Sequence, residues 1–268
     1  MKLYISADIE GTIGVLDRCE CREGEHDYEK ARIYMTKEVI AAINGAKRAG
    51  ASKVVIKDGH ATGRNIIVDM LPEDVEIIRG WSGHPFKMMQ ELDETFDGVI
   101  FTGYHSGAGL GGNNLAHTIN GGVIRKIKIN GELASEYLIN SYTAASVGVP
   151  VIFLSGDENL VEEVKSKNNG TGTVAVKRGV GGSVISLSIN EGLKAIEDGV
   201  EKSVSRVNEI KISTLPEEFN IEIEYMSEVQ AVRGSYYPGF KKTGVMTIEA
   251  TFKNYFDVLR ALLFLTRA

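Results

Sequence analysis

The sequence predicts an α/β protein: a layered α/β/α domain on a mostly parallel sheet, followed by a smaller α+β C-terminal unit. Short apolar strands alternate with helices over about the first 182 residues, which is typical of parallel sheets covered by helices. From about Ser188 the pattern changes to a helix, alternating strands and a last helix. We therefore expect a domain over residues 1–187 and a smaller unit over residues 188–268, the latter either separate or an extension of the same sheet.

The expected strands are apolar runs or alternating segments bounded by turn residues. They cover residues 2–7, 53–57, 75–78, 98–102, 123–129, 150–155, 173–177, 221–225 and 245–251. Residues 123–129 alternate apolar with basic side chains, which predicts one solvent-exposed face, and Asn130-Gly131 is a strong turn signal after them.

The expected helices carry apolar side chains at helical spacing. They cover residues 28–49, 84–95, 133–147, 188–210 and 254–266. In the first, Ile33, Ile40 and Ile43 recur at this spacing, and Gly50 suits the position past its end. Ser188 and Glu191 form a capping-box pattern at the start of the fourth.

Composition narrows the possible partners. The net charge is −6 and the Lys and Arg residues are dispersed, which argues against nucleic acid or an anionic membrane surface as a partner. No signal peptide or membrane-spanning apolar run is found, so we expect a cytoplasmic protein. Cys19 and Cys21 are expected to be reduced thiols in a loop.

Asp8 and Glu10 follow the first strand directly. Residues two apart in an extended segment point to the same side, so these two carboxylates lie together. Two like charges this close require a cation, a shared proton or water. The pair is therefore a candidate metal site, with a solvated turn as the alternative.

Two further strands end near a histidine. His60 follows the strand at 53–57, and His105 follows the strand at 98–102. Ligands of open parallel sheets bind outside the carboxyl ends of the strands. If these strands are neighbours, both histidines converge with Asp8 and Glu10 on a metal site for zinc, manganese or iron.

A third carboxylate, Glu132 or Glu136, follows the turn after residue 129. Glu132 sits at the turn and fits a solvated position better. Three carboxylates leave a charge of −1 with one divalent ion and +1 with two. A net positive charge at the site lowers the pKa of bound water to about 7. The charge count therefore favours two metal ions that share Asp8 over one ion.

His117 lies beyond a glycine-rich loop at residues 107–112. A loop histidine beside a metal site can transfer protons, although a merely exposed histidine fits the spacing equally well. The loop matches G-x-G-x-x-G, but the helix that a dinucleotide site requires does not follow it. We expect the glycines to bend the backbone and position His117.

The sequence resembles the DppA-type D-aminopeptidases, a family of dinuclear zinc peptidases. The resemblance rests on K-L-Y-I-S-A-D-I-E-G at the start, D-G-H at 58–60, G-Y-H at 103–105, A-H-T at 116–118 and V-P-V-I-F-L-S-G-D at 149–157. It extends over most of the chain. These motifs, in this order, are highly specific.

The resemblance implies a zinc-dependent aminopeptidase with two zinc ions per subunit that hydrolyses short peptides, D-residue peptides among them, in a homodecamer. It implies that the zinc ligands are Asp8 as a bridge, Glu10, His60, His105 and a last glutamate, and that His117 is catalytic. The family's G-E-L-G context is absent around the last glutamate. The spacing to the strand near Val149 favours Glu136 as this glutamate. Glu132, in Gly131-Glu132-Leu133, is the alternative if the motif is aligned a few residues earlier.

Two other classes of function stay open. One is a non-catalytic, metal-containing protein that binds peptides for uptake. The other is a dinuclear hydrolase of other amides or esters. A phosphoester substrate is disfavoured because we expect only Lys57 and Arg64 near the ligand loops. The preference for D or L residues is not encoded in any motif.

Overall fold

The computed structural model describes residues 1–167 and 169–267. Its helices are α1 (Tyr28–Arg48), α2 (Glu136–Ser146), α3 (Glu158–Ser166), α4 (Ile189–Val204), α5 (Glu228–Ser235) and α6 (Tyr255–Leu265). Its strands are β1 (Lys2–Ala7), β2 (Lys53–Asp58), β3 (Val75–Ile78), β4 (Gly98–Tyr104), β5 (Ile124–Ile129), β6 (Glu132–Leu133), β7 (Val151–Asp157), β8 (Gly172–Val180), β9 (Ser183–Ser186), β10 (Phe219–Tyr225), β11 (Lys241–Lys242) and β12 (Thr247–Phe252).

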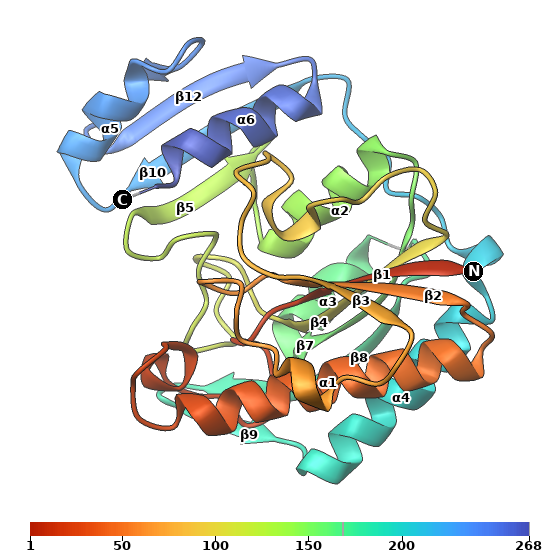
Figure 1. Cartoon of the computed structure of the whole chain (residues 1–268). Coiled ribbons are helices and arrows are strands. Elements are labelled where there is room, and N and C mark those ends of the chain that lie inside the picture. Colours follow the sequence, from red (N-terminus) through yellow and green to blue (C-terminus); the bar gives the residue numbers. More distant parts are fainter. Residues whose placement is uncertain (168, 268) are drawn as a thin grey trace.

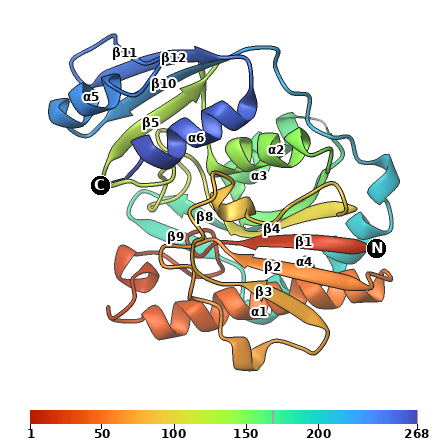
Figure 2. The ribbon, with the colours of Figure 1, turned by 45° about the horizontal axis from the view of Figure 1, so that its top comes forward.

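The large sheet has the order β3-β2-β1-β4-β7-β8-β9 and is parallel except for its edge strand β9. Figure 2 shows β1 between β2 and β4. Strands β1, β2, β4 and β7 are buried almost throughout, which explains why they are continuous apolar runs in the sequence. Helices α1 and α4 pack on one face of this sheet, and α2 and α3 pack on the other.

A second, antiparallel sheet has the order β11-β12-β10-β5-β6 and packs against α6 and one side of α2. Helix α2 lies between the two sheets (Figure 1). Its Tyr137 and Ala144 belong to the core of the large sheet, while Leu138 and Ile139 belong to the core of the second. Because both cores contact α2, the helix has a fixed position relative to each sheet.

The predicted α/β class with a mostly parallel sheet is confirmed. The predicted domain boundary at residue 188 does not coincide with a change of sheet, because β5 and β6 precede it and α4 follows it on the α1 layer. The division into two domains therefore stays a prediction. None of the helices in the described part of the chain is both long and apolar enough to span a membrane.

Two helix predictions are wrong in extent. The segment 84–95 contains only a 3₁₀ turn at Lys87–Met89, because Lys87 and Glu91 have left-handed φ angles of 49° and 66°. The spacing of its apolar residues by three suits a 3₁₀ turn as well as a helix. The helix predicted to reach residue 210 ends at Val204.

The sequence prediction also missed α3 and α5. Asp157 caps α3 by accepting a hydrogen bond from the Leu160 amide, so this start signal was present in the sequence.

Candidate metal centre

The carboxyl ends of β1, β2 and β4 meet at one edge of the large sheet. Ala7 at the end of β1 lies opposite Asp58 of β2 and Thr102 of β4. The residues that follow these strands are therefore brought together, as the sequence predicts for neighbouring strands. Asp8, Glu10, His60 and His105 are all buried there.

Asp8, Glu10 and His60 form one cluster with ligand atoms within 4.8 Å of one another. His60 Nδ1 lies 2.9 Å from Glu10 Oε2 and 3.3 Å from Asp8 Oδ1. His60 Nε2 donates a hydrogen bond of 2.6 Å to the Cys21 carbonyl. This bond places the proton of a neutral imidazole on Nε2, so the Nδ1 lone pair faces the carboxylates.

His105, His117 and Glu136 form a second cluster with ligand atoms within 4.8 Å of one another. Glu136 Oε1 lies 3.8 Å from His105 Nε2 and 3.8 Å from His117 Nε2. Each histidine donates its Nδ1 proton to a carbonyl, of Ser106 at 2.9 Å and of Leu115 at 2.8 Å. Both Nε2 lone pairs are thereby directed toward the cluster.

Asp8 connects the two clusters. Its Oδ1 faces His60, and its Oδ2 lies 3.6 Å from His105 Nε2. A carboxylate with one oxygen toward each ligand group is the arrangement that a bridge between two cations requires.

The side chains of the two clusters do not satisfy all of one another's hydrogen-bonding atoms. Within the described residues, the buried atoms His105 Nε2 and Glu10 Oε2 have no hydrogen-bond partner. Glu10 Oε2 is close to His60 but outside hydrogen-bonding geometry. Buried polar atoms without partners are costly, and nitrogen and oxygen donors that converge without bonding fit a zinc site.

The electrostatics of the centre depend on protons when no cation is bound. Burial and then the charge of Glu10 raise the pKa of Asp8 to about 7. Burial opposes charge on Glu10 and His60 as well, but their mutual attraction lowers the pKa of Glu10 and raises that of His60. A divalent cation would supply the positive charge that protons otherwise supply.

Of the two candidate glutamates, Glu136 lies at the centre and Glu132 does not. Glu136 begins α2, is 5% exposed and accepts a 2.7 Å hydrogen bond from the Ile119 amide. Ser135 caps this helix through the Leu138 amide. The Glu132 side chain is half exposed and pairs with Lys167.

Two buried charged residues that the sequence analysis missed support the centre. Asp157 accepts hydrogen bonds from the amide and hydroxyl of Ser106, whose carbonyl orients His105. Lys177 donates to the carbonyls of Glu10 and Val15. Asp157 ends β7 just as Asp8 follows β1, so its place at a strand end was the available signal.

The glycine-rich loop bends as expected, and the next regular element after it in the described residues is β5 rather than a helix. A Cβ on Gly112 would lie 2.2 Å from Asn159, and Gly112 has a φ of 75°. At Gly11, next to Glu10, a Cβ would lie 1.7 Å from the Tyr104 carbonyl. At Gly11 another backbone segment leaves no room for a side chain, and at Gly112 the positive φ angle also disfavours one.

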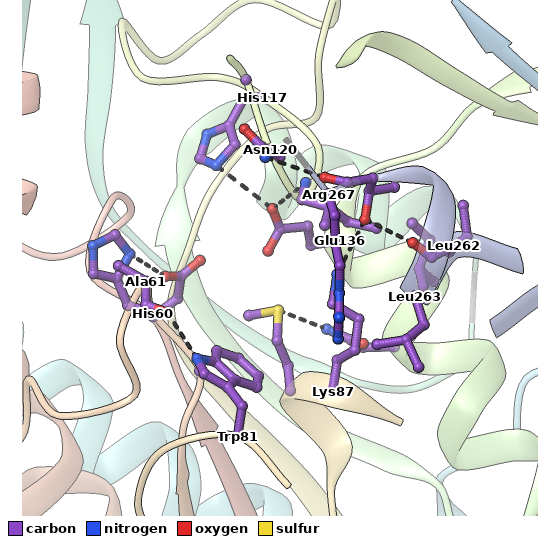
Figure 3. A pocket seen from close by; sticks show the side chains of 18 of the residues that line it. His60, Ala61, Trp81, Lys87, His117, Asn120, Glu136, Leu262, Leu263 and Arg267 are labelled. Carbon is purple, nitrogen blue, oxygen red and sulfur yellow. Dashed lines mark hydrogen bonds and ion pairs between the residues drawn. The ribbon is translucent and has the colours of Figure 1, made fainter. Parts of the chain in front are cut away.

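A cavity of about 650 Å³ opens in front of both clusters, a volume suited to a small organic ligand (Figure 3). Its apolar lining includes Phe86, Ile139, Leu259, Leu262 and Leu263. Cys21 also lines it, and both cysteines are free thiols. Burial raises the pKa of the Cys21 thiol, which disfavours a reactive thiolate.

The expectation about nearby cations was wrong. Arg64 pairs with Glu23, and Lys57 donates to the Gly80 carbonyl beneath the Trp81 ring. The basic residues that line the cavity are instead Arg18, Arg22, Lys87 and Arg267. Arg18 and Arg22 follow the Asp8 and Glu10 motif, whereas Lys87 and Arg267 come from parts of the sequence far from the metal motifs, so motif spacing did not indicate them.

Comparison with known proteins places this geometry in a family. A family model described as D-aminopeptidase matches residues 1–264. A curated D-aminopeptidase of Bacillus subtilis (strain 168) is 31% identical over 268 residues, which covers 99% of this chain and 97% of the relative. A solved structure titled "Zn-dependent D-aminopeptidase DppA from Bacillus subtilis, a self-compartmentalizing protease" superimposes with a TM-score of 0.93 at 30% identity, and covers 99% of this chain and 97% of that one.

Proposed function

The chain belongs to the D-aminopeptidase family, and on that basis we propose that it is a zinc-dependent aminopeptidase that releases the N-terminal residue of short peptides, D-residue peptides among them. The observation that carries the proposal is the pair of buried ligand clusters joined by the two oxygens of Asp8. The unpaired nitrogen and oxygen atoms that converge there support bound metal, and turnover is what separates the enzyme from a metal-containing binding protein.

We propose that the centre would hold two zinc ions, one through Glu10 and His60 and the other through His105 and Glu136, with one oxygen of Asp8 available to each. When bound, such ions polarise a carbonyl and lower the pKa of water to about 7. The protein's part is to orient the donors: the carbonyl bonds on His60 and His105 fix which nitrogen of each ring faces the centre.

His117 is the proposed catalytic residue. Its side chain is 24% exposed and lines the cavity, whereas His105 of the same cluster is almost fully buried and does not line it. The hydrogen bond from Nδ1 to the Leu115 carbonyl holds the ring with Nε2 toward Glu136. In this position Nε2 can accept a proton from the nucleophile and return it to the leaving amine. The same nitrogen also meets the geometry of a ligand, so the assignment requires a direct test.

The first experiment measures zinc content and the hydrolysis of D-alanyl and L-aminoacyl dipeptides, with and without chelator. We expect about two zinc ions per chain, and turnover that chelation abolishes and zinc restores. Peptide binding without turnover in zinc-loaded protein would favour the uptake protein instead. The ratio of D to L turnover gives the stereochemical preference.

Two variants test the residue assignments. His117→Ala should abolish turnover and keep zinc, whereas loss of zinc would reassign His117 as a ligand. Glu136→Gln should lose zinc, and Glu132→Gln is its matched control because Glu132 is half exposed and pairs with Lys167. Equal zinc loss in both glutamate variants would refute the choice of Glu136.

The relative is described as self-compartmentalizing, and we propose that this chain also forms a homo-oligomer. More specifically, we propose a homodecamer. Several apolar side chains of the C-terminal third are more than half exposed: Met226, Val229, Tyr236, Val245 and Phe264. Where such side chains gather into one patch, they are typical of subunit interfaces. Light scattering should give about ten times the 29.2 kDa chain mass, and a monomer mass would contradict the proposal.

A further inference from the structure

The side of the cavity opposite His60 is lined by basic side chains. Figure 3 shows Lys87 and Arg267 on the opposite side of the cavity from His60, with Glu136 between them. Lys87 belongs to the 3₁₀ turn at Lys87–Met89, and Arg267 follows α6. Two basic side chains from distant parts of the sequence thus meet at one wall.

Lys87 has no acidic partner within ion-pair distance among the described residues. Its Nζ donates only a 3.3 Å hydrogen bond to Thr266 Oγ1. Burial lowers its pKa to about 8; Glu136 opposes this effect and Arg267 adds to it. A partly buried ammonium group without an ion-pair partner is suited to an anion brought in by a ligand.

The backbone at Lys87 is also held in an uncommon conformation. Its φ of 49° is in the left-handed region, which costs a residue other than glycine roughly 1 kcal/mol or more. The buried neighbours Met88 and Met89 anchor the turn in the core of the large sheet. Strain of this kind persists where the surrounding structure fixes it, and it is concentrated at ligand sites.

We propose that Lys87, with Arg267 beside it, binds the C-terminal carboxylate of a short peptide substrate and thereby selects dipeptides and tripeptides over longer chains. The inference rests on the proposed function for the position of the peptide's amino end at the metal centre. Arg18 and Arg22 also line the cavity, but both are exposed, as is Arg267, so Lys87 is the only partly buried cation among these four. The apolar lining from Phe86 and α6 then surrounds the peptide between its charged ends.

The test compares a D-alanyl dipeptide acid with the same dipeptide as its C-terminal amide. Calorimetric binding to chelator-treated protein measures recognition without turnover, and zinc-loaded protein measures kcat/KM for both peptides. Wild type should prefer the acid by about tenfold or more in both measurements, as expected for a charge-assisted hydrogen bond.

Lys87→Met keeps the apolar stem and should bring the acid-to-amide ratio near one, and Lys87→Arg should restore much of it. The matched control is Lys211→Met, which removes an exposed lysine outside the cavity and should leave the ratio unchanged. Because the ratio is internal to each variant, partial loss of folded protein does not alter it.

Equal affinity of wild type for acid and amide, including failure to bind either, would overturn the inference. An unchanged preference in Lys87→Met would overturn it as well. Hydrolysis of both peptides at equal kcat/KM would leave the proposed function intact and refute only the carboxylate site. A preserved preference for binding the acid without any hydrolysis by zinc-loaded protein would refute the proposed function and support the site.

Discussion

Glu38 on α1 provides a pH-dependent support for the loop that carries Glu10. It is fully buried, and its Oε1 accepts a 2.7 Å hydrogen bond from the Ile13 amide. Burial raises its pKa from 4.5 to about 8, although that hydrogen bond and Lys177 oppose the shift. The folded protein therefore keeps this carboxyl group protonated at neutral pH.

Glu38→Gln removes this titration while keeping the shape of the side chain. Between about pH 4.5 and about pH 8 the folded state binds a proton that the unfolded state releases. Stability from this group is complete below the unfolded pKa and is lost as the pH rises through that range. The pKa of Glu38 rises from 4.5 to about 8 on folding. At about 1.4 kcal/mol per pKa unit, this titration can change the free energy of unfolding by at most about 5 kcal/mol.

Urea unfolding of chelator-treated protein, at one protein concentration, measures this effect. We expect the variant to gain about 2–4 kcal/mol of unfolding free energy relative to wild type between about pH 5.5 and about pH 8.5. The single tryptophan, Trp81, provides a fluorescence signal. Glu29→Gln is the matched control, because Glu29 lies on the same helix with an exposed side chain.

Parallel pH profiles for wild type and Glu38→Gln would refute the reasoning, because the titrating group would then not be Glu38. A Glu29→Gln profile that also diverges from wild type would refute it too, since the effect would arise from the overall charge of the helix.

Three further changes test the packing and supports of the centre. Gly11→Ala places a Cβ 1.7 Å from the Tyr104 carbonyl and should destabilise the fold by about 3 kcal/mol or more, read as a lower Tm; an unchanged Tm would contradict this contact. Lys177→Met leaves the Glu10 carbonyl and a second carbonyl without their donor, so we expect a loss of about 1–3 kcal/mol in urea unfolding, and no loss would show that water replaces the lysine. Asp157→Asn weakens the hold on the loop behind His105 and should lower zinc affinity about 10- to 100-fold in chelator competition, whereas wild-type affinity would remove its supporting role.

The strand ends explain why much of the fold and centre could be predicted. Strands β1, β2 and β4 are buried on both faces, so each is a continuous apolar run that is visible in the sequence. Parallel strands put their carboxyl ends at one edge, and a ligand-type residue follows each of these three. The convergence of Asp8 and Glu10 with two histidines therefore needed no knowledge of side-chain packing.

The segment 84–95 could not be predicted in the same way. Its apolar spacing fits a helix, but the left-handed φ angles at Lys87 and Glu91 are imposed by the way Met88 and Met89 pack on the large sheet. The basic wall of the cavity also depends on this turn, so the same packing that defeated the helix prediction placed Lys87 beside Arg267.

The sequence by itself determined the class of the sheet, the order of its ligand-bearing strand ends and the nitrogen and oxygen chemistry of the centre, because these follow from local periodicity and residue type. Only the tertiary structure placed Glu136 at the centre and Glu132 away from it, brought His117 to the centre and assembled the cavity from segments far apart in the chain. Helix α2 shows the physical reason: Glu136 faces the centre because the rest of the helix is packed between two cores, and no short stretch of sequence contains both of them.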